Sequence, residues 1–342
     1  MKGTRRILVT GGAGFIGSAF VRLLLGSSSV IARRGAPKQS QPPEISVVDK
    51  LTYAGDLKRL MSPKGTVPFY KTDICNKKQI EAIFAKEKPQ IVVHFAAESH
   101  VDRSISNAAP FIETNIKGTQ VLIDSARKHK VSKFIFISTD EVYGEIANGK
   151  FTENSPIRPN SPYAASKAAA DLLVQAYIRT NKFPAIIIRP SNNYGPWQYP
   201  EKLIPLAILR IFEQGKVPVY GRGQNVREWL YVDDCVRGIM TIMHKGKIGQ
   251  IYNLGGSCES KNIDTVKLLL KTLGVSQERW EFVKDRLGHD IRYRLDSRKV
   301  TRELGWKPDV RLAQGLKLTV AWSLKHQPWL KSKLKDINNL YK

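Results

Sequence analysis

Short apolar runs alternate with longer amphipathic segments through the first half of the chain. The runs are bounded by polar or glycine-rich residues, which is typical of buried strands separated by helices. Strands are predicted at 5–9, 45–48, 67–70, 90–95, 133–137 and 184–188. Helices are predicted between them at 15–25, 76–86, 104–130 and 161–180. Because strands alternate with helices, we predict an α/β protein with a doubly wound parallel sheet.

The pattern becomes less regular after Gly195. Helices are predicted at 203–214, 262–273, 296–304 and 312–326, short strands at 217–220 and 251–254, and a further helix after 227–234. We therefore predict a sheet domain at 1–195 and a smaller, interleaved substrate lobe at 196–330, some of whose segments return to the sheet domain. Residues 331–342 are predicted to form a polar, frayed tail.

A glycine-rich turn follows the first predicted strand. Residues 10–17 read Thr-Gly-Gly-Ala-Gly-Phe-Ile-Gly and lead into the first helix. Glycines permit a tight turn and the helix N-terminus attracts phosphate, so the stretch predicts a Rossmann-type dinucleotide site. Asp49 ends the second strand, where an acid suits the ribose hydroxyls of NAD and disfavours NADP without excluding it. Asp73 and Ile74 are placed at the adenine edge, and Ala96 and Ala97 leave room for the cofactor.

A hydroxyl and two acids follow the fifth predicted strand, as Thr139, Asp140 and Glu141. Tyr163 and Lys167 lie one helical turn apart, on one helix face. With a dinucleotide loop, this Tyr-x-x-x-Lys pair predicts oxidation of a secondary alcohol, with Lys167 and the oxidised nicotinamide lowering the pKa of the phenol. Adjacent carboxylates can act as acid and base if their surroundings separate their pKa values. From the residues alone, a merely solvated acid pair is an equal alternative.

Composition adds three expectations. The net charge of +25 over 342 residues favours anionic partners, but the basic residues are scattered, so we prefer a basic enzyme surface to a nucleic-acid site. Cys75, Cys235 and Cys258 lie far apart without metal-ligand spacing, which predicts reduced thiols in a cytoplasmic protein and no metal site. No apolar run is long enough to span a bilayer.

Together these motifs resemble the extended short-chain dehydrogenase/reductase family and, within it, the dTDP-glucose 4,6-dehydratases. The resemblance covers nearly the whole chain and rests on residues 10–17, 49–55, 96–105, 138–144, 191–196, 200–205 and 303–308. Thr139-Asp140-Glu141 is its discriminating part, because related sugar epimerases generally carry small hydroxyl residues there. The chain departs from the family in a longer loop at 30–44, in Leu287 where proline is usual, and in its basic charge.

The resemblance implies an NAD-dependent lyase that acts on a nucleotide-activated glucose, most simply dTDP-glucose, with UDP-glucose next. It implies oxidation at C4, loss of water across C5–C6 and return of hydride to C6, giving a 4-keto-6-deoxy sugar. It assigns Glu141 as base, Asp140 as acid and Thr139 to the C4 oxygen. It also implies a homodimer formed through the helices at 104–130 and 161–180.

The remaining site residues follow from chain order and the resemblance. The predicted cofactor contacts are Gly11, Gly14, Phe15, Ile16, Gly17, Asp49, Lys50, Leu51, Thr52, Asp73, Ile74, Phe95, Ala96, Ala97, Ser99, Thr114, Tyr163, Lys167 and Asn192. The predicted substrate contacts are Ser99, Thr139, Asn192, Lys202, Leu203, Pro218, Val219, Tyr220, Arg227, Asn262, Asp285, Arg286, Leu287, Gly288 and His289. Among these, Arg227 is the preferred diphosphate ligand.

Two other classes of function stay open at this stage. A nucleotide-sugar epimerase or a sugar-acid decarboxylase would have the same fold, and the acid pair argues against both. A basic protein that binds RNA or a protein partner and holds NAD as a ligand would not need Tyr163, Lys167 or the acid pair.

Overall fold

A seven-stranded parallel sheet forms the centre of the protein. The computed structural model describes residues 5–26, 43–61 and 67–340. The strand order is β10-β6-β5-β4-β1-β2-β3, and every neighbouring pair is parallel. The strands are β1 (Arg6–Thr10), β2 (Glu44–Asp49), β3 (Phe69–Lys71), β4 (Ile91–His94), β5 (Lys133–Ile137), β6 (Ala185–Pro190) and β10 (Ile251–Leu254). This confirms the predicted doubly wound sheet, with the strand at 251–254 returning to it.

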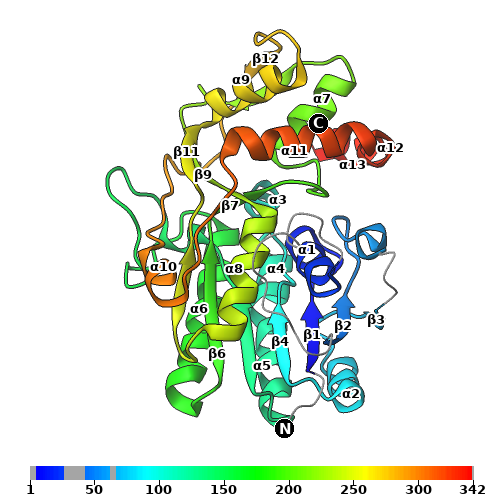
Figure 1. Ribbon diagram of the computed structural model, residues 1–342, viewed down its shortest axis with the longest axis vertical. Coiled ribbons are helices and arrows are strands. Elements are labelled where there is room, and N and C mark those ends of the chain that lie inside the picture. The colour runs from blue at the N-terminus through cyan, green and yellow to red at the C-terminus, as the bar shows by residue number, and fades with distance from the viewer. Residues whose placement is uncertain (1–4, 27–42, 62–66, 341–342) are drawn as a thin grey trace.

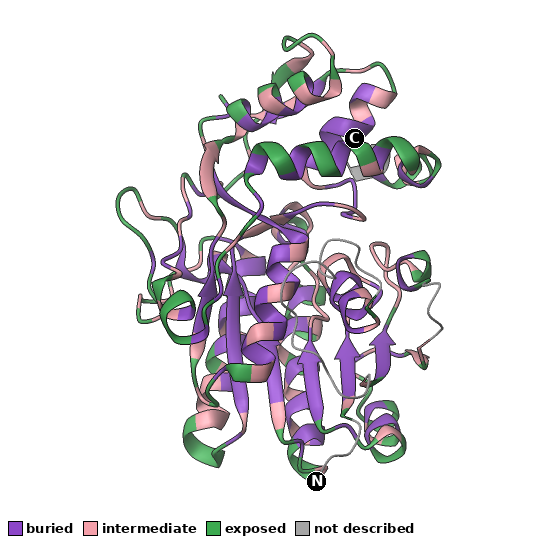
Figure 2. Ribbon diagram, viewed as in Figure 1, coloured by how far each residue is buried: buried purple, intermediate pink, exposed green. Residues whose placement is uncertain are grey.

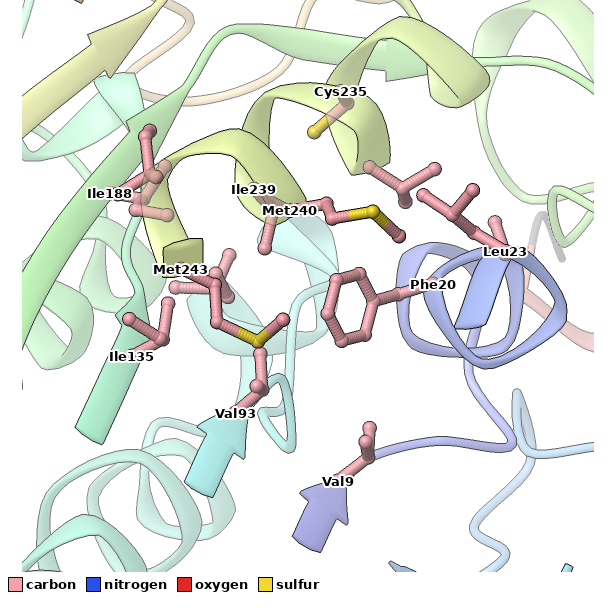
Figure 3. Packing of buried hydrophobic residues seen from close by; sticks show 14 of the residues in the cluster. Val9, Phe20, Leu23, Val93, Ile135, Ile188, Cys235, Ile239, Met240 and Met243 are labelled. Carbon is pink, nitrogen blue, oxygen red and sulfur yellow. The ribbon is translucent and has the colours of Figure 1, made fainter. Parts of the chain in front are cut away.

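Helices cover both faces of this sheet (Figure 1). They include α1 (Phe15–Leu24), α2 (Lys77–Glu87), α5 (Thr119–Lys128), α6 (Pro162–Asn181), α8 (Val232–Lys245) and α10 (Arg298–Leu304). On one face Phe20 of α1 and Met243 of α8 pack with Ile135 of β5 (Figure 3). On the other face Phe134 packs with side chains of α2, α5 and α6. Because adjacent residues of β5 face opposite layers and both layers are buried, the strand is apolar from Phe134 to Ile137. The strands of the central sheet are buried over most of their length (Figure 2).

The smaller lobe lies beyond the carboxyl ends of the strands (Figure 1). Its helices are α7 (Leu203–Phe212), α9 (Asn262–Leu273), α11 (Leu312–Lys325), α12 (Gln327–Lys331) and α13 (Leu334–Leu340). It also has a three-stranded sheet in the order β11 (Cys258–Lys261), β9 (Val226–Tyr231) and β7 (Asn192–Tyr194), in which β9 is antiparallel to β11 and parallel to β7. A separate parallel pair consists of β8 (Val217–Tyr220) and β12 (Trp280–Val283). A separate apolar core joins these elements.

The prediction of one long helix at 104–130 is wrong. The chain instead forms α3 (Val101–Ser106), α4 (Ala109–Phe111), a π-helical segment η2 (Ile112–Gly118) and then α5. Asn107 breaks the run with an extended backbone, and its Oδ1 accepts the N–H of Ala109 at 3.1 Å. Pro110 follows, and because it has no N–H to donate, it fits only the first turn of the new helix.

The prediction of a frayed tail after residue 331 is also wrong for the residues that the structure describes. Residues 334–340 form α13, and Ile337 is fully buried. The hydroxyl of Tyr199 donates to Asp336 at 2.9 Å, and Lys333 pairs with Asp56 at 3.2 Å. The tail therefore packs on the smaller lobe and on the loop after β2. Most of the long loop predicted at 30–44 lies outside the described residues.

Two short 3-10 helices complete the elements that position the site. They are η1 (Leu57–Leu60), after β2, and η3 (Asp140–Tyr143), after β5. Across the described part of the chain, no helix combines the length and apolar character needed to cross a membrane.

Candidate active site

A cavity of about 970 Å³ lies where the carboxyl ends of the sheet strands meet the smaller lobe. Phe95 follows β4, Ser138 follows β5 and Pro190 ends β6, and all three line it. From the other side it is lined by residues of α7, β8 and β9. This edge is where open parallel α/β sheets bind their ligands.

The glycine loop closes tightly under one end of the cavity. Gly11 has a φ of +70°, and a Cβ there would lie 2.5 Å from the backbone nitrogen of Ala96. Gly14 caps α1 without any side-chain hydrogen bond. The cap residue therefore offers no side-chain acceptor to the first N–H groups of the helix, and a phosphate placed here would accept from them.

Asp49 holds this loop in place as well as lining the cavity. One carboxylate oxygen accepts the N–H of Ala13 at 2.9 Å, and the other accepts the N–H of Leu51 at 2.8 Å. Burial raises the pKa of Asp49, and these backbone donors oppose the rise. Two other predicted cofactor contacts, Lys50 and Asp73, form an ion pair of 2.7 Å with each other.

The two adjacent acids lie in different electrostatic surroundings. Asp140 is buried, and burial together with the charges of Glu141 and Glu228 raises its pKa well above the usual value. Burial also raises the pKa of Glu141, but the cations Lys202 and Arg227 oppose that rise. Asp140 is therefore favoured as a neutral acid, while Glu141 has partners that stabilise its charged form. This separation is what an acid–base pair needs.

Thr139 joins the acid pair to the tyrosine. Its hydroxyl donates to Asp140 Oδ1 at 3.2 Å and accepts the N–H of Glu141 at 3.3 Å. A side-chain hydrogen bond with Thr139 also opposes the rise in the pKa of Tyr163. The hydroxyls of Thr139 and Tyr163 thus face one point in the cavity, next to both acids.

The predicted lowering of the Tyr163 pKa is not found in the protein alone. Burial raises this pKa, and the charges of Glu141 and Asp140 raise it further. Lys167 instead donates from Nζ to the carbonyl of Ile137 at 2.7 Å. Burial lowers the pKa of Lys167 to about 8. A deprotonated phenol at this position therefore needs a positive charge beyond that of the lysine.

Basic residues line the smaller-lobe side of the cavity. Arg227 is nearly buried and donates to the carbonyls of Val226 and Asp290, both at 2.9 Å. Its guanidinium lies 4.5 Å from the centre of the Tyr293 ring. The cationic side chains along the lining are Lys202, Arg210, Lys216, Arg227, Lys284 and Arg286. Such a wall suits a ligand that carries phosphate groups.

Several buried polar atoms on the lining have no hydrogen-bond partner among the residues that the structure describes. They are Ser138 Oγ, Asp140 Oδ2, Ser191 Oγ, Asn192 Oδ1, Asn193 Oδ1, Gln198 Oε1 and Asn262 Oδ1. Buried polar groups in folded proteins are normally paired, so these atoms mark where ligand groups would pair with them. With the glycine loop, they show that the cavity fits a dinucleotide and a polar second ligand.

The structure brings nearly all predicted site residues to this one cavity. The exceptions are Leu51, Asp285 and Leu287, which do not line it. Leu51 gives its N–H to Asp49, and Asp285 accepts a bond from His289 at 2.7 Å, so both hold loops. The side chain of Leu287 is 74% exposed and lies outside the lining, so its assignment as a substrate contact stays a prediction.

Some lining residues were not predicted. Tyr293 and Asp290 complete the pocket around Arg227, and they follow directly after the predicted segment 285–289. Arg59 is buried and donates to the carbonyls of Ala13 (2.9 Å) and Trp197 (3.1 Å). No local signal marks Arg59, because these partners come from distant parts of the chain.

The sheet, the glycine loop and the Tyr163–Lys167 pair define an extended short-chain dehydrogenase/reductase, and the acid pair lines the same cavity. Residues 8–319 match the model of the GDP-mannose 4,6 dehydratase family, and the chain belongs to this family.

Several proteins that are similar to this chain over most of its length are dTDP-glucose 4,6-dehydratases. A dTDP-glucose 4,6-dehydratase of Streptomyces griseus is 47% identical, over 95% of this chain and 96% of the relative. The crystal structure of a dTDP-glucose 4,6-dehydratase from Streptomyces venezuelae, solved with NAD bound, has a TM-score of 0.87 and 46% identity, covering 95% of this chain and 98% of that one. The UDP-glucose 4-epimerase of Thermotoga maritima shares the fold at a TM-score of 0.84 with 32% identity, covering 94% and 99%.

Proposed function

We propose that the protein is an NAD-dependent hydro-lyase that converts dTDP-glucose to its 4-keto-6-deoxy derivative. One observation carries the proposal: burial raises the pKa of both adjacent acids, but neighbouring carboxylates add to the rise at Asp140, whereas the cations Lys202 and Arg227 oppose it at Glu141. An epimerase needs no such pair, because it only oxidises and reduces C4. The similarity to dTDP-glucose dehydratases supports the substrate, with UDP-glucose as the second candidate.

NAD fits the end of the cavity formed by the glycine loop. The N–H groups at the start of α1 would hold its pyrophosphate, and Asp49 and Asp73 would lie at its adenosine half. NAD would supply a reversible hydride acceptor for oxidation at C4 and reduction at C6. Its positive charge would also supply the field that the Tyr163 phenol lacks in the protein alone.

The chain's own groups divide the proton transfers. Tyr163 takes the proton of the C4 hydroxyl, Thr139 donates to the C4 oxygen, and Lys167 holds the cofactor ribose. Oxidation at C4 acidifies the neighbouring C5–H, and Glu141 removes that proton and returns it to C5 when C6 is reduced. Asp140, kept neutral by burial, gives its proton to the departing C6 hydroxyl, which leaves as water.

The smaller lobe holds the nucleotide half of the substrate. Arg227 and Lys202 would face the diphosphate. Asn192 and Asn262 would offer side-chain amides whose oxygens have no partner within the described part of the chain. These two sets of expected contacts support a division into a cofactor domain at 1–195 and a mainly substrate-binding lobe at 196–330. Because several cations line this wall, part of the basic charge serves the substrate.

We propose a cytoplasmic homodimer. Ile112 of η2 and Leu172 of α6 are about half exposed although both are large and apolar, and the two segments pack side by side. A second copy would cover this face and form a four-helix bundle. The three cysteines are free thiols, which suits a reducing compartment.

The test of the activity is a direct assay. Purified protein is incubated separately with dTDP-glucose and UDP-glucose, without added reductant, and products are identified by NMR. Formation of the 4-keto-6-deoxy sugar from dTDP-glucose is expected, and Tyr163→Phe should abolish it. An epimer or a pentose in its place, or no product from either substrate, would overturn the proposal.

A further inference from the structure

The segment that carries the acid pair is fixed at both ends. Thr139 caps η3 through the N–H of Glu141, at 3.3 Å. At the other end Gly144 has a φ of +78°, and a Cβ there would lie 2.2 Å from the carbonyl oxygen of Arg158. The next hydrogen bond runs from the N–H of Arg158 to the carbonyl of Val142 at 3.0 Å. The short helix therefore has little freedom to shift along its axis.

Tyr143, the last residue of η3, connects this segment to a buried network. It is 2% exposed, and its ring stacks on Phe151 with centroids 5.0 Å apart. Its hydroxyl accepts a hydrogen bond from Arg189 Nη1 at 2.8 Å and donates one to Asn253 Oδ1 at 2.8 Å. Arg189 belongs to β6 and Asn253 to β10, so one hydroxyl joins η3 to two strands of the sheet.

The network continues from Arg189 to the helix that carries the redox pair. Arg189 donates to both carboxylate oxygens of Asp171, at 2.9 and 2.8 Å, and both side chains are fully buried. Asp171 lies on α6 four residues after Lys167, on the same face. Tyr143, Arg189 and Asp171 thus form an unbroken chain of contacts from the acid pair to the Tyr163–Lys167 helix.

A buried ion pair with all its hydrogen-bond partners in place is rigid, and removal of one partner strongly destabilises the fold. It is therefore suited to fixing geometry rather than to taking part in proton transfer. Tyr143 does not line the cavity, whereas Asp140 and Glu141 on the same short helix do. Any effect of Tyr143 on the reaction must act through the position of those acids.

We propose that Tyr143 is a positioning residue: through Arg189 and Asp171 it holds Asp140 and Glu141 in register with Tyr163 and Lys167. The inference rests on the proposed function, because it assumes that the acids act in elimination while the tyrosine and lysine act in oxidation. It predicts that loosening Tyr143 impairs elimination more than oxidation.

The test uses Tyr143→Phe, which keeps the ring on Phe151 and leaves the Arg189–Asp171 pair intact, so that the fold is retained. The matched control is Tyr252→Phe. Tyr252 is also fully buried, and its hydroxyl likewise accepts one bond, from the N–H of Lys247, and donates one, to Glu303. Its partners lie away from the cavity lining.

Two readouts are taken on the wild type and on both variants. Hydrogen–deuterium exchange should become faster in peptides covering 138–146 in Tyr143→Phe only. With dTDP-glucose, Tyr143→Phe should lower kcat by about tenfold or more, with KM unchanged and the oxidised 4-ketoglucose form accumulating before elimination. Tyr252→Phe should show neither effect.

The outcomes separate the two proposals. Unchanged exchange at 138–146, or a kcat loss in Tyr143→Phe that the control shares, overturns the positioning role. If the wild type itself does not dehydrate the sugar, the proposed function fails, and the exchange result alone decides the inference. Faster exchange confined to 138–146 then supports the restraint by Tyr143, and unchanged exchange contradicts it.

Discussion

The ammonium group of Lys167 donates to the backbone carbonyl of Ile137 at 2.7 Å, and burial lowers the pKa of this lysine to about 8. In the unfolded chain the pKa returns to its ordinary value of 10.5. Between these two values the unfolded chain binds more protons than the folded one. Burial of the Lys167 ammonium group therefore makes the free energy of unfolding rise with pH between these two pKa values.

For the cofactor-free protein, the free energy of unfolding should rise with pH from about 8 to about 10.5 relative to the variant Lys167→Met. The reason is that a buried charge is relieved in the folded wild type over this window, and the variant has none to relieve. The gain should reach up to about 3 kcal/mol. Urea unfolding of both proteins at several pH values measures it, and a difference that does not change with pH contradicts the account.

Gly11 and Gly274 both have φ near +70°, yet only Gly11 faces backbone at short range. Gly274→Ala should cost about 1–2 kcal/mol of stability, the ordinary penalty of the left-handed conformation. Gly11→Ala should cost more and should weaken NAD binding by at least about tenfold, since its Cβ would displace the segment at Ala96. Calorimetric titration with NAD and urea unfolding measure both effects. Equal behaviour of the two variants would remove the close-approach argument.

Most strands of the central sheet could be predicted because they are buried and carry short apolar runs, such as 7–9, 91–93, 134–137 and 185–188. Pairings between distant segments could not. β8 and β12 pair although about 60 residues separate them, and the sequence at 280–283 does not indicate which strand it pairs with. The break at Asn107 has a sequence signal in Pro110, because proline fits the first turn of a helix and not its interior.

Residues of local motifs could be assigned to the cavity from the sequence, whereas contacts that depend on packing could not. The glycine loop and Thr139-Asp140-Glu141 stand within short stretches of sequence. The rise in the Tyr163 pKa depends on burial, which a sequence motif does not measure. Arg59 reaches Ala13 and Trp197 from positions 46 and 138 residues away, so only the fold reveals that contact.

The packed C-terminal helix gives a further prediction. Ile337→Ala should lower the free energy of unfolding by about 2–5 kcal/mol, because the side chain is fully buried in the core of the smaller lobe. Leu324→Ala on α11 is the matched control, since Leu324 is 59% exposed and its loss should cost little. Urea unfolding compares them. A neutral Ile337→Ala would show that the tail is frayed, as the sequence alone predicts.

We expect Asp140 to act as the acid that protonates the departing C6 hydroxyl. Asp140→Asn keeps a polar side chain of the same size but cannot give a proton, so kcat for the 4-keto-6-deoxy product should fall by about 10²–10⁴-fold. Oxidation at C4 should persist, because Tyr163 and Lys167 are untouched. Rapid-quench analysis of the sugar products distinguishes the two steps. Unchanged kcat would assign the proton to another group.

The central claim is that Glu141 removes the C5 proton, and Glu141→Gln tests it most directly. The change keeps size and hydrogen bonding but removes the base. With dTDP-glucose the variant should still oxidise C4, seen as reduced cofactor that stays bound, while C5 hydrogen exchange with solvent and the 4-keto-6-deoxy product are lost. Product formation by Glu141→Gln at the wild-type rate would contradict the mechanism.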